Sequence, residues 1–189
     1  MYRCLVHYPK IDTTMIEEFR KKYDFTYDLI KAHITIVFPN DVKISGEKIS
    51  KHVKSVLSSW KSFDIKFEGF TKSFDNWLFL TITKGNDKII QLYKDLYTDI
   101  LSPYRKLDIF IPHIGLGYFS KKEDKTKFAN YLDLQSYKGE KFFDEQEYKK
   151  ALLEAEKQNF AYSTRVDELT LIDLDKSYSS IIDIEIIKL

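Results

Sequence analysis

Hydrophobic and polar residues follow one another along this chain with two periods, one typical of strands and one typical of helices. Apolar residues at every second position predict a strand, and apolar residues three and four positions apart predict a helix. The strand pattern covers residues 3–8, 63–74, 77–83, 166–174, 180–189 and the two segments that carry His33 and His113. The helical pattern covers residues 14–22, 45–60, 122–132, 144–157 and the segment from Asn86 to Pro103.

The predicted elements have a similar order in the two halves of the chain. Each half has a strand with a histidine, then a helix, then two further strands. Such a repeat predicts an α+β protein of two similar lobes packed side by side. Residues 137–164 have no counterpart in the first half and are rich in Lys, Glu, Gln and Tyr. We expect this helical insertion either on the solvated surface or as a lid over a groove, within a single two-lobed domain spanning residues 1–189.

Composition and charge exclude some kinds of site but do not indicate a particular function. The chain has 189 residues, of which 43% are apolar and 31% charged, as in ordinary soluble domains. Its formal net charge of +1 neither favours nor opposes an anionic ligand. Cys4 is the only cysteine, which excludes an intramolecular disulfide and a cysteine-cluster metal site. No segment reads as a signal peptide or membrane span, so we expect a cytoplasmic protein without membrane contact. We also expect a monomer.

Two short segments resemble each other and carry the chemistry. Residues 32–39 read AHITIVFP and residues 112–119 read PHIGLGYF, with their histidines 80 positions apart (113 − 33). Residues two apart share one face of a strand, so Thr35 lies on the face of His33 and Gly115 on the face of His113. If the two strands pair across a pseudo-two-fold axis, both imidazoles face one groove.

Two histidines in one groove suit the cleavage of a phosphodiester. One group must take a proton from the nucleophile and another must give a proton to the leaving oxygen, and imidazole titrates near neutral pH. The hydroxyl of Thr35 can donate to a non-bridging phosphate oxygen. This scheme requires no metal or cofactor, and the sequence has no metal-ligand cluster or glycine-rich phosphate loop.

At these residues the chain resembles the 2H phosphoesterase superfamily, which includes 2′-5′ RNA ligase-like proteins and cyclic phosphodiesterases. The family has two His-x-Thr/Ser motifs, each with a hydrophobic residue directly after it. Residues 33–36 (HITI) match the motif fully, and residues 113–116 (HIGL) match it in part. The resemblance implies mostly antiparallel sheets flanking a central groove, with helices outside. It also implies metal-independent catalysis by His33 and His113 on RNA ends or small nucleotides that carry a 2′,3′-cyclic phosphate or a 2′-5′ linkage.

The departure from the family pattern is Gly115, which supplies no hydroxyl. Losing one donor to a charged oxygen can cost about 2.7–4 kcal/mol of transition-state stabilisation. One interpretation is that another group replaces the hydroxyl, and a second is that Gly115 and Gly117 clear space for a bulkier substrate. A third interpretation is a module that binds RNA or a nucleotide without turnover. A fourth is that both histidines are structural core residues.

Five residues near the motifs are candidates for contact with the substrate. Gly115 belongs to the second motif, and Phe38 and Tyr118 could stack a base at the groove rim. Tyr8 and Arg3 would line the groove if the first strand lies next to the histidine strand.

Overall fold

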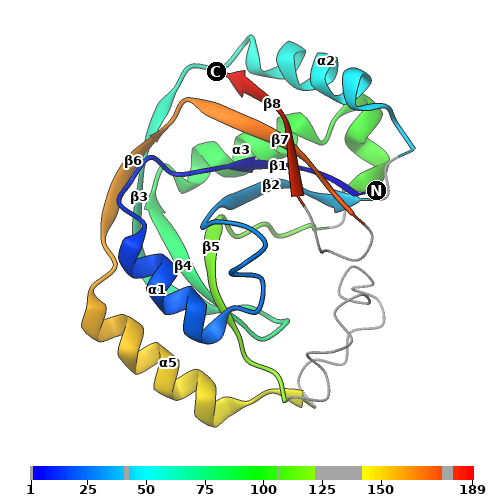
Figure 1. The fold of residues 1–189 in the computed structure, drawn as a ribbon. Helices are drawn as coiled ribbons and strands as arrows, with labels where there is room; N and C mark the ends of the chain where they lie inside the picture. The colour runs from blue at the N-terminus through cyan, green and yellow to red at the C-terminus, as the bar shows by residue number, and fades with distance from the viewer. Residues whose placement is uncertain (1, 41–42, 106, 122–141, 176–180) are drawn as a thin grey trace.

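The computed structural model describes residues 2–40, 43–105, 107–121, 142–175 and 181–189 (Figure 1). Its strands form two antiparallel sheets of four. In spatial order, the first sheet contains β2 (Ile34–Asn40), β1 (Tyr2–His7), β7 (Glu168–Leu174) and β8 (Ile181–Lys188). The second contains β5 (His113–Tyr118), β4 (Trp77–Lys84), β3 (Phe63–Lys72) and β6 (Tyr162–Val166). The α+β class with two antiparallel sheets is therefore confirmed.

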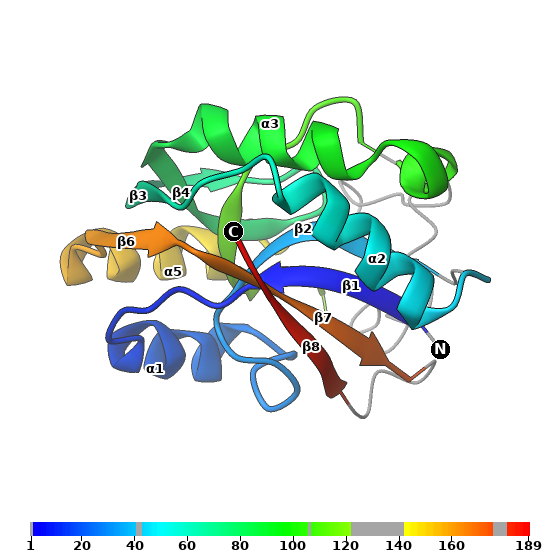
Figure 2. The ribbon, with the colours of Figure 1, turned by 90° about the horizontal axis from the view of Figure 1, so that it is seen from above.

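The two sheets are not the two halves of the chain, contrary to the order inferred from the repeat. The hairpin of β3 and β4 comes after the His33 strand in sequence but pairs with β5, the His113 strand. The sheet of His33 is completed from the far end of the chain, by β7 and β8. Figure 2 shows β1 beside β7, which places the beginning and the end of the chain in one sheet. Local periodicity cannot predict this arrangement, because strand pairing depends on contacts between residues far apart in the sequence.

The two histidine strands do not pair with each other. β2 and β5 are edge strands of different sheets and touch where the sheets meet. The condition that the two strands pair is therefore not met, although the strands are neighbours. Helix α1 (Thr14–Tyr23) comes after β1 and packs on β5, whereas α3 (Asn86–Leu96) comes after β4 and packs on β2.

Most predicted helices form, with one clear difference in extent. Helix α2 (Gly46–Leu57) begins after Ser45, whose hydroxyl accepts a hydrogen bond from the Lys48 amide. Helix α3 ends at Leu96 rather than continuing to Pro103, because Asp99 has a φ of +42° and a separate 3₁₀ helix, η1 (Asp99–Tyr104), contains the proline. The helix predicted at residues 122–132 lies outside the described residues.

The insertion expected at residues 137–164 contains a helix and a strand. Helix α5 (Glu145–Gln158) packs on α1, where Glu154 accepts hydrogen bonds from Lys22 and Tyr23. It buries Tyr148, Ala151 and Ala155, so it is not a fully solvated helix. The last residues of the insertion belong to β6, an edge strand of the second sheet, and residues 137–141 lie outside the described part.

Candidate active site

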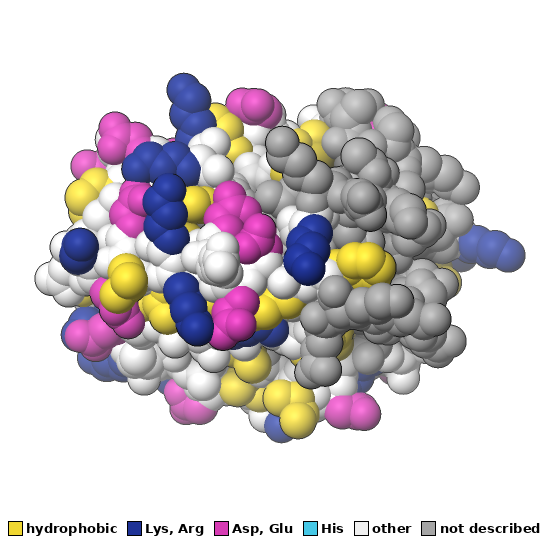
Figure 3. All heavy atoms as spheres, turned by 90° about the horizontal axis from the view of Figure 1, so that it is seen from below, with side chains coloured by type: hydrophobic (Ala, Val, Ile, Leu, Met, Phe, Trp, Pro, Cys, Tyr) yellow, Lys and Arg dark blue, Asp and Glu magenta, His cyan; other side chains and the backbone are white. Residues whose placement is uncertain are grey.

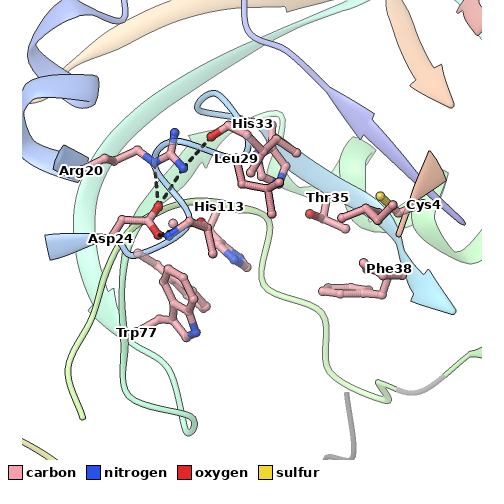
Figure 4. Close-up of a pocket in the computed structure, with 15 residues that line it drawn as sticks. Cys4, Arg20, Asp24, Leu29, His33, Thr35, Phe38, Trp77 and His113 are labelled. Atoms are coloured by element: carbon pink, nitrogen blue, oxygen red, sulfur yellow. Dashed lines mark hydrogen bonds and ion pairs between the residues drawn. The ribbon is translucent and has the colours of Figure 1, made fainter. Parts of the chain in front are cut away.

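His33 and His113 line the same pocket, which lies where the two sheets meet (Figure 4). His33 directly precedes β2, and His113 is the first residue of β5. The space open to water in this pocket is about 170 Å³. The other residues that line it are Cys4, Arg20, Asp24, Thr26, Leu29, Ile30, Thr35, Phe38, Pro39, Trp77, Phe79, Gly115 and Leu174. Tertiary structure thus brings together the two histidines that are far apart in the sequence.

Both imidazole rings are held in the same way by a nearby backbone carbonyl. Nδ1 of His33 lies 2.8 Å from the oxygen of Lys31, and Nδ1 of His113 lies 2.5 Å from the oxygen of Ile111. A carbonyl oxygen only accepts, so Nδ1 carries the hydrogen in each ring. The neutral imidazoles therefore have a basic Nε2, and this is the atom at which each ring can exchange a proton with a ligand.

The surroundings of the two histidines disfavour their charged forms. Burial lowers the pKa of His33 to about 4, and the positive charges of Arg20 and His113 act in the same direction. The carbonyl of Lys31 and the carboxylate of Asp24 oppose this shift. Burial likewise lowers the pKa of His113 to about 4, against the effect of the Ile111 carbonyl. Both rings are consequently neutral at pH 7 in the free protein.

The two motifs differ at the position two residues after each histidine. Thr35 lines the pocket, as its position relative to His33 predicts. At Gly115, an added Cβ would lie 3.4 Å from two carbons of the Trp77 indole. At Gly117, an added Cβ would lie 2.6 Å from Cβ of Tyr23. A Cβ at Gly115 would therefore just contact the indole, whereas Tyr23 leaves no room for one at Gly117.

Aromatic residues of β4 form the wall next to the second histidine. The ring of Phe79 stacks on His113, with 3.4 Å between the ring centroids and 15° between the planes. Trp77 is 7% exposed and lines the pocket beside Phe79. Tyr118 is 4% exposed and packs on Trp77 with the centroids 5.4 Å apart, so it supports the wall without lining the pocket. Phe38 lines the pocket as predicted.

The structure does not place Tyr8 and Arg3 in the pocket. The ring of Tyr8 approaches His33 edge-on, with 6.3 Å between the centroids, and packs on the cluster around Cys4 and Val6. Arg3 pairs with Asp173 at 2.8 Å and donates to the carbonyl of Ile44 at 2.6 Å. Arg3 and Cys4 point to opposite faces of β1, so only Cys4 reaches the pocket of the histidines.

The charged residues of the pocket wall were not predicted from the sequence. Arg20 and Asp24 lie at the end of α1 in a run of charged residues, EEFRKKYD, which is typical of a solvated helix end. Arg20 is nevertheless 1% exposed and forms an ion pair with Glu17. It forms a second ion pair with Asp24 (Figure 4). The spacing of three and four residues permits these pairs, but it does not show that this face of the helix is buried.

The surface around α1 and α5 has charges of both signs. In Figure 3, basic and acidic side chains lie interspersed over this face, and two of its ion pairs are Lys22–Glu154 and Glu145–Lys149. The charges of this surface therefore do not favour a phosphate, and any attraction of a phosphate would come from residues of the pocket. Among the described residues, no three His, Cys, Asp or Glu side chains gather as metal ligands, and no helix is long and apolar enough to span a membrane.

The chain is similar to known proteins both in sequence and in fold. Residues 8–177 match the 2′-5′ RNA ligase superfamily, and the chain belongs to that family. Two relatives carry the name "Putative phosphoesterase". The protein of Geobacillus kaustophilus is 24% identical over 146 residues, which cover 76% of this chain and 83% of the relative. The protein of Bacillus licheniformis is 22% identical over 131 residues, covering 67% and 75%.

Solved structures show the same fold at low sequence identity. Escherichia coli LigT in its apo form superposes with a TM-score of 0.55 at 14% identity, covering all of this chain and 96% of LigT. A crystal structure described as a phosphoesterase superposes with a TM-score of 0.54 at 13% identity, covering all of this chain and 98% of the other. The expected 2H phosphoesterase fold is thereby confirmed.

Proposed function

We propose that this protein is a metal-independent phosphodiesterase in which His33 and His113 act as general base and general acid. One observation carries the proposal. Two histidines from strands of separate sheets line one pocket with Thr35, and each ring is held by the carbonyl two residues before it. Acid–base cleavage of a phosphodiester needs two such groups on either side of the reacting phosphorus.

The proposed reaction is derived from the orientation of the rings. One Nε2 takes a proton from the attacking water while the other ring, protonated at Nε2, gives its proton to the leaving ribose oxygen. The hydroxyl of Thr35 donates to a non-bridging oxygen and stabilises the charge that develops there. An anionic phosphate in the pocket would raise the pKa of the nearby histidine and so supply the protonated partner.

The proposed substrates are RNA ends or small nucleotides with a 2′,3′-cyclic phosphate or a 2′-5′ linkage. Solved structures of E. coli LigT include complexes with ATP and with 3′-AMP, which supports a nucleotide ligand for this related fold. The pocket also combines a hydroxyl and two imidazoles with the aromatic rings of Phe38 and Trp77. Rings of this kind are suited to contact a nucleobase.

Turnover of a nucleotide panel in EDTA tests the proposal. Cyclic and 2′-5′-linked nucleotides are incubated with the wild type, His33→Ala, His113→Ala and the control His52→Ala, whose imidazole contacts the Leu96 carbonyl from α2. We expect turnover by the wild type and the control, and its loss in both pocket variants. Turnover that survives both pocket substitutions would refute the assignment of the site.

A protein that binds nucleotides without turning them over is the second candidate. It is favoured by Gly115, which supplies no hydroxyl to the second motif although it lines the pocket. Binding of the panel without product formation would support this alternative over catalysis.

A further inference from the structure

The loop before His33 is attached to α1 by an ion-pair cluster that the proposed reaction does not use. We define the α1 clamp as Glu17, Arg20 and Asp24. The guanidinium of Arg20 donates to Glu17 at 2.9 Å and to the carbonyl of Ile30 at 2.8 Å. It also donates to Asp24 at 2.8 Å (Figure 4). A buried arginine whose donors meet two carboxylates and a carbonyl has one fixed geometry.

The second carboxylate oxygen of Glu17 reaches the backbone next to His33. Its Oε1 accepts a hydrogen bond from the amide of Ala32 at 2.6 Å, while Oε2 is held by Arg20. The amide of Ala32 and the carbonyl of Lys31 belong to the same peptide unit. Because a peptide unit is planar, holding its N–H also sets the direction of its C=O.

That carbonyl is the group that orients the histidine. The oxygen of Lys31 accepts the hydrogen of His33 Nδ1 at 2.8 Å. The contacts therefore run without a break from Arg20 to Glu17, through the peptide unit of Lys31 and Ala32, to the imidazole of His33. The clamp also holds the preceding peptide unit, because Arg20 binds the carbonyl of Ile30.

The second histidine is supported differently. Nδ1 of His113 donates to Ile111, but the next residue is Pro112, which has no N–H that a carboxylate could bind. The proline ring restricts φ and stiffens this segment without a partner from elsewhere in the fold. A clamp on the peptide N–H is thus possible only at the first histidine, where the corresponding residue is Ala32.

We propose that Glu17, anchored by Arg20, is a positioning residue that holds the Lys31 carbonyl so that His33 keeps its proton on Nδ1 and its basic Nε2 toward the pocket. Its effect on turnover rests on the proposed function. Its effect on the tautomer of His33 does not depend on any activity.

The test compares Glu17→Ala with the control Glu154→Ala. Glu154 is also a carboxylate in ion-pair contact with α1, through Lys22, but it does not touch the loop before His33. The ¹⁵N shifts of both histidines are recorded above pH 7. We expect Glu17→Ala to increase the Nε2–H tautomer at His33 and to leave His113 unchanged, whereas the control changes neither ring.

Turnover supplies the second measurement. A misplaced catalytic group loses up to about a hundredfold in rate, so we expect kcat of Glu17→Ala to fall about tenfold to a hundredfold with little change in KM. Glu17→Gln keeps an acceptor for the Ala32 amide and should restore the wild-type tautomer and most of kcat. If Glu17→Ala does not fold, a tautomer at His33 that differs from the wild type in folded Glu17→Gln would overturn the positioning role.

The outcomes separate the two proposals. A wild-type tautomer at His33 in folded Glu17→Ala would overturn the positioning role, whatever the activity. If the wild type turns over no nucleotide, the proposed function fails, and the ¹⁵N shifts still decide whether Glu17 positions His33.

Discussion

The low pKa of the two pocket histidines has a measurable consequence for stability in acid. Both rings are neutral in the folded protein because burial lowers their pKa to about 4. In the unfolded chain each regains its ordinary pKa of about 6.5. Between these values the unfolded state binds more protons than the folded state, so stability falls as the pH falls from 6.5 toward 4.

The size of the effect is set by the two pKa values. Each histidine has a pKa of 6.5 in the unfolded chain and of about 4 in the folded protein. Lowering the pH from 7.5 to 5.0 therefore reduces the free energy of unfolding by about 2 kcal/mol for each histidine. Both side chains keep partial contact with solvent, which reduces the figure to about 1–2 kcal/mol each. We therefore expect the pair to account for about 2–4 kcal/mol of the loss in the free energy of unfolding between these pH values.

Urea unfolding of the wild type and the double variant His33→Gln/His113→Gln at pH 7.5 and 5.0 measures this difference. Tryptophan fluorescence reports the transition, since Trp77 lies in the pocket wall. The double variant should lose about 2–4 kcal/mol less than the wild type on acidification. Thr35→Val, which alters the same pocket without removing a titrating group, should lose as much as the wild type.

Equal losses in the wild type and the double variant would refute the reasoning. That result would mean that both imidazoles keep an ordinary pKa in the folded protein, and therefore that water reaches them freely. The comparison is a difference between pH values, so any uniform destabilisation by the two substitutions cancels.

Three further predictions concern the reaction and the second motif. Thr35→Val should lower kcat about 10²–10³-fold with little change in KM, because it removes a donor to the developing charge; an unchanged kcat would exclude that role. Gly115→Val should lower the free energy of unfolding by about 1–3 kcal/mol, because its methyl groups would press on the Trp77 indole. The control Gly115→Ala places its Cβ at contact distance from the indole and should unfold nearly as the wild type does. The kcat/KM for a cyclic nucleotide should fall about tenfold per pH unit above pH 5, because the histidine that acts as general acid is then rarely protonated in the free enzyme. A plateau in kcat/KM from pH 5 to 7 would contradict a pKa near 4 for both histidines.

The local structure and the central residues of the candidate site could be predicted from the amino-acid sequence. Helical periodicity and caps located α1, α2 and α5, because helix signals depend on residues three or four apart. Strand alternation placed Thr35 on the face of His33. The similarity of the two histidine segments was also visible, since each segment is a run of contiguous residues.

The sequence could not show which strands share a sheet or which side chains complete the pocket. The hairpin of β3 and β4 joins the His113 strand rather than the His33 strand that precedes it. Arg3 was expected in the groove but pairs with Asp173, whereas Arg20, in a run of charges, is buried beside His33. Strands more than a hundred residues apart pair through contacts between distant segments. The burial of one charged side chain among many also depends on such contacts. Periodicity within one segment carries no information about such contacts.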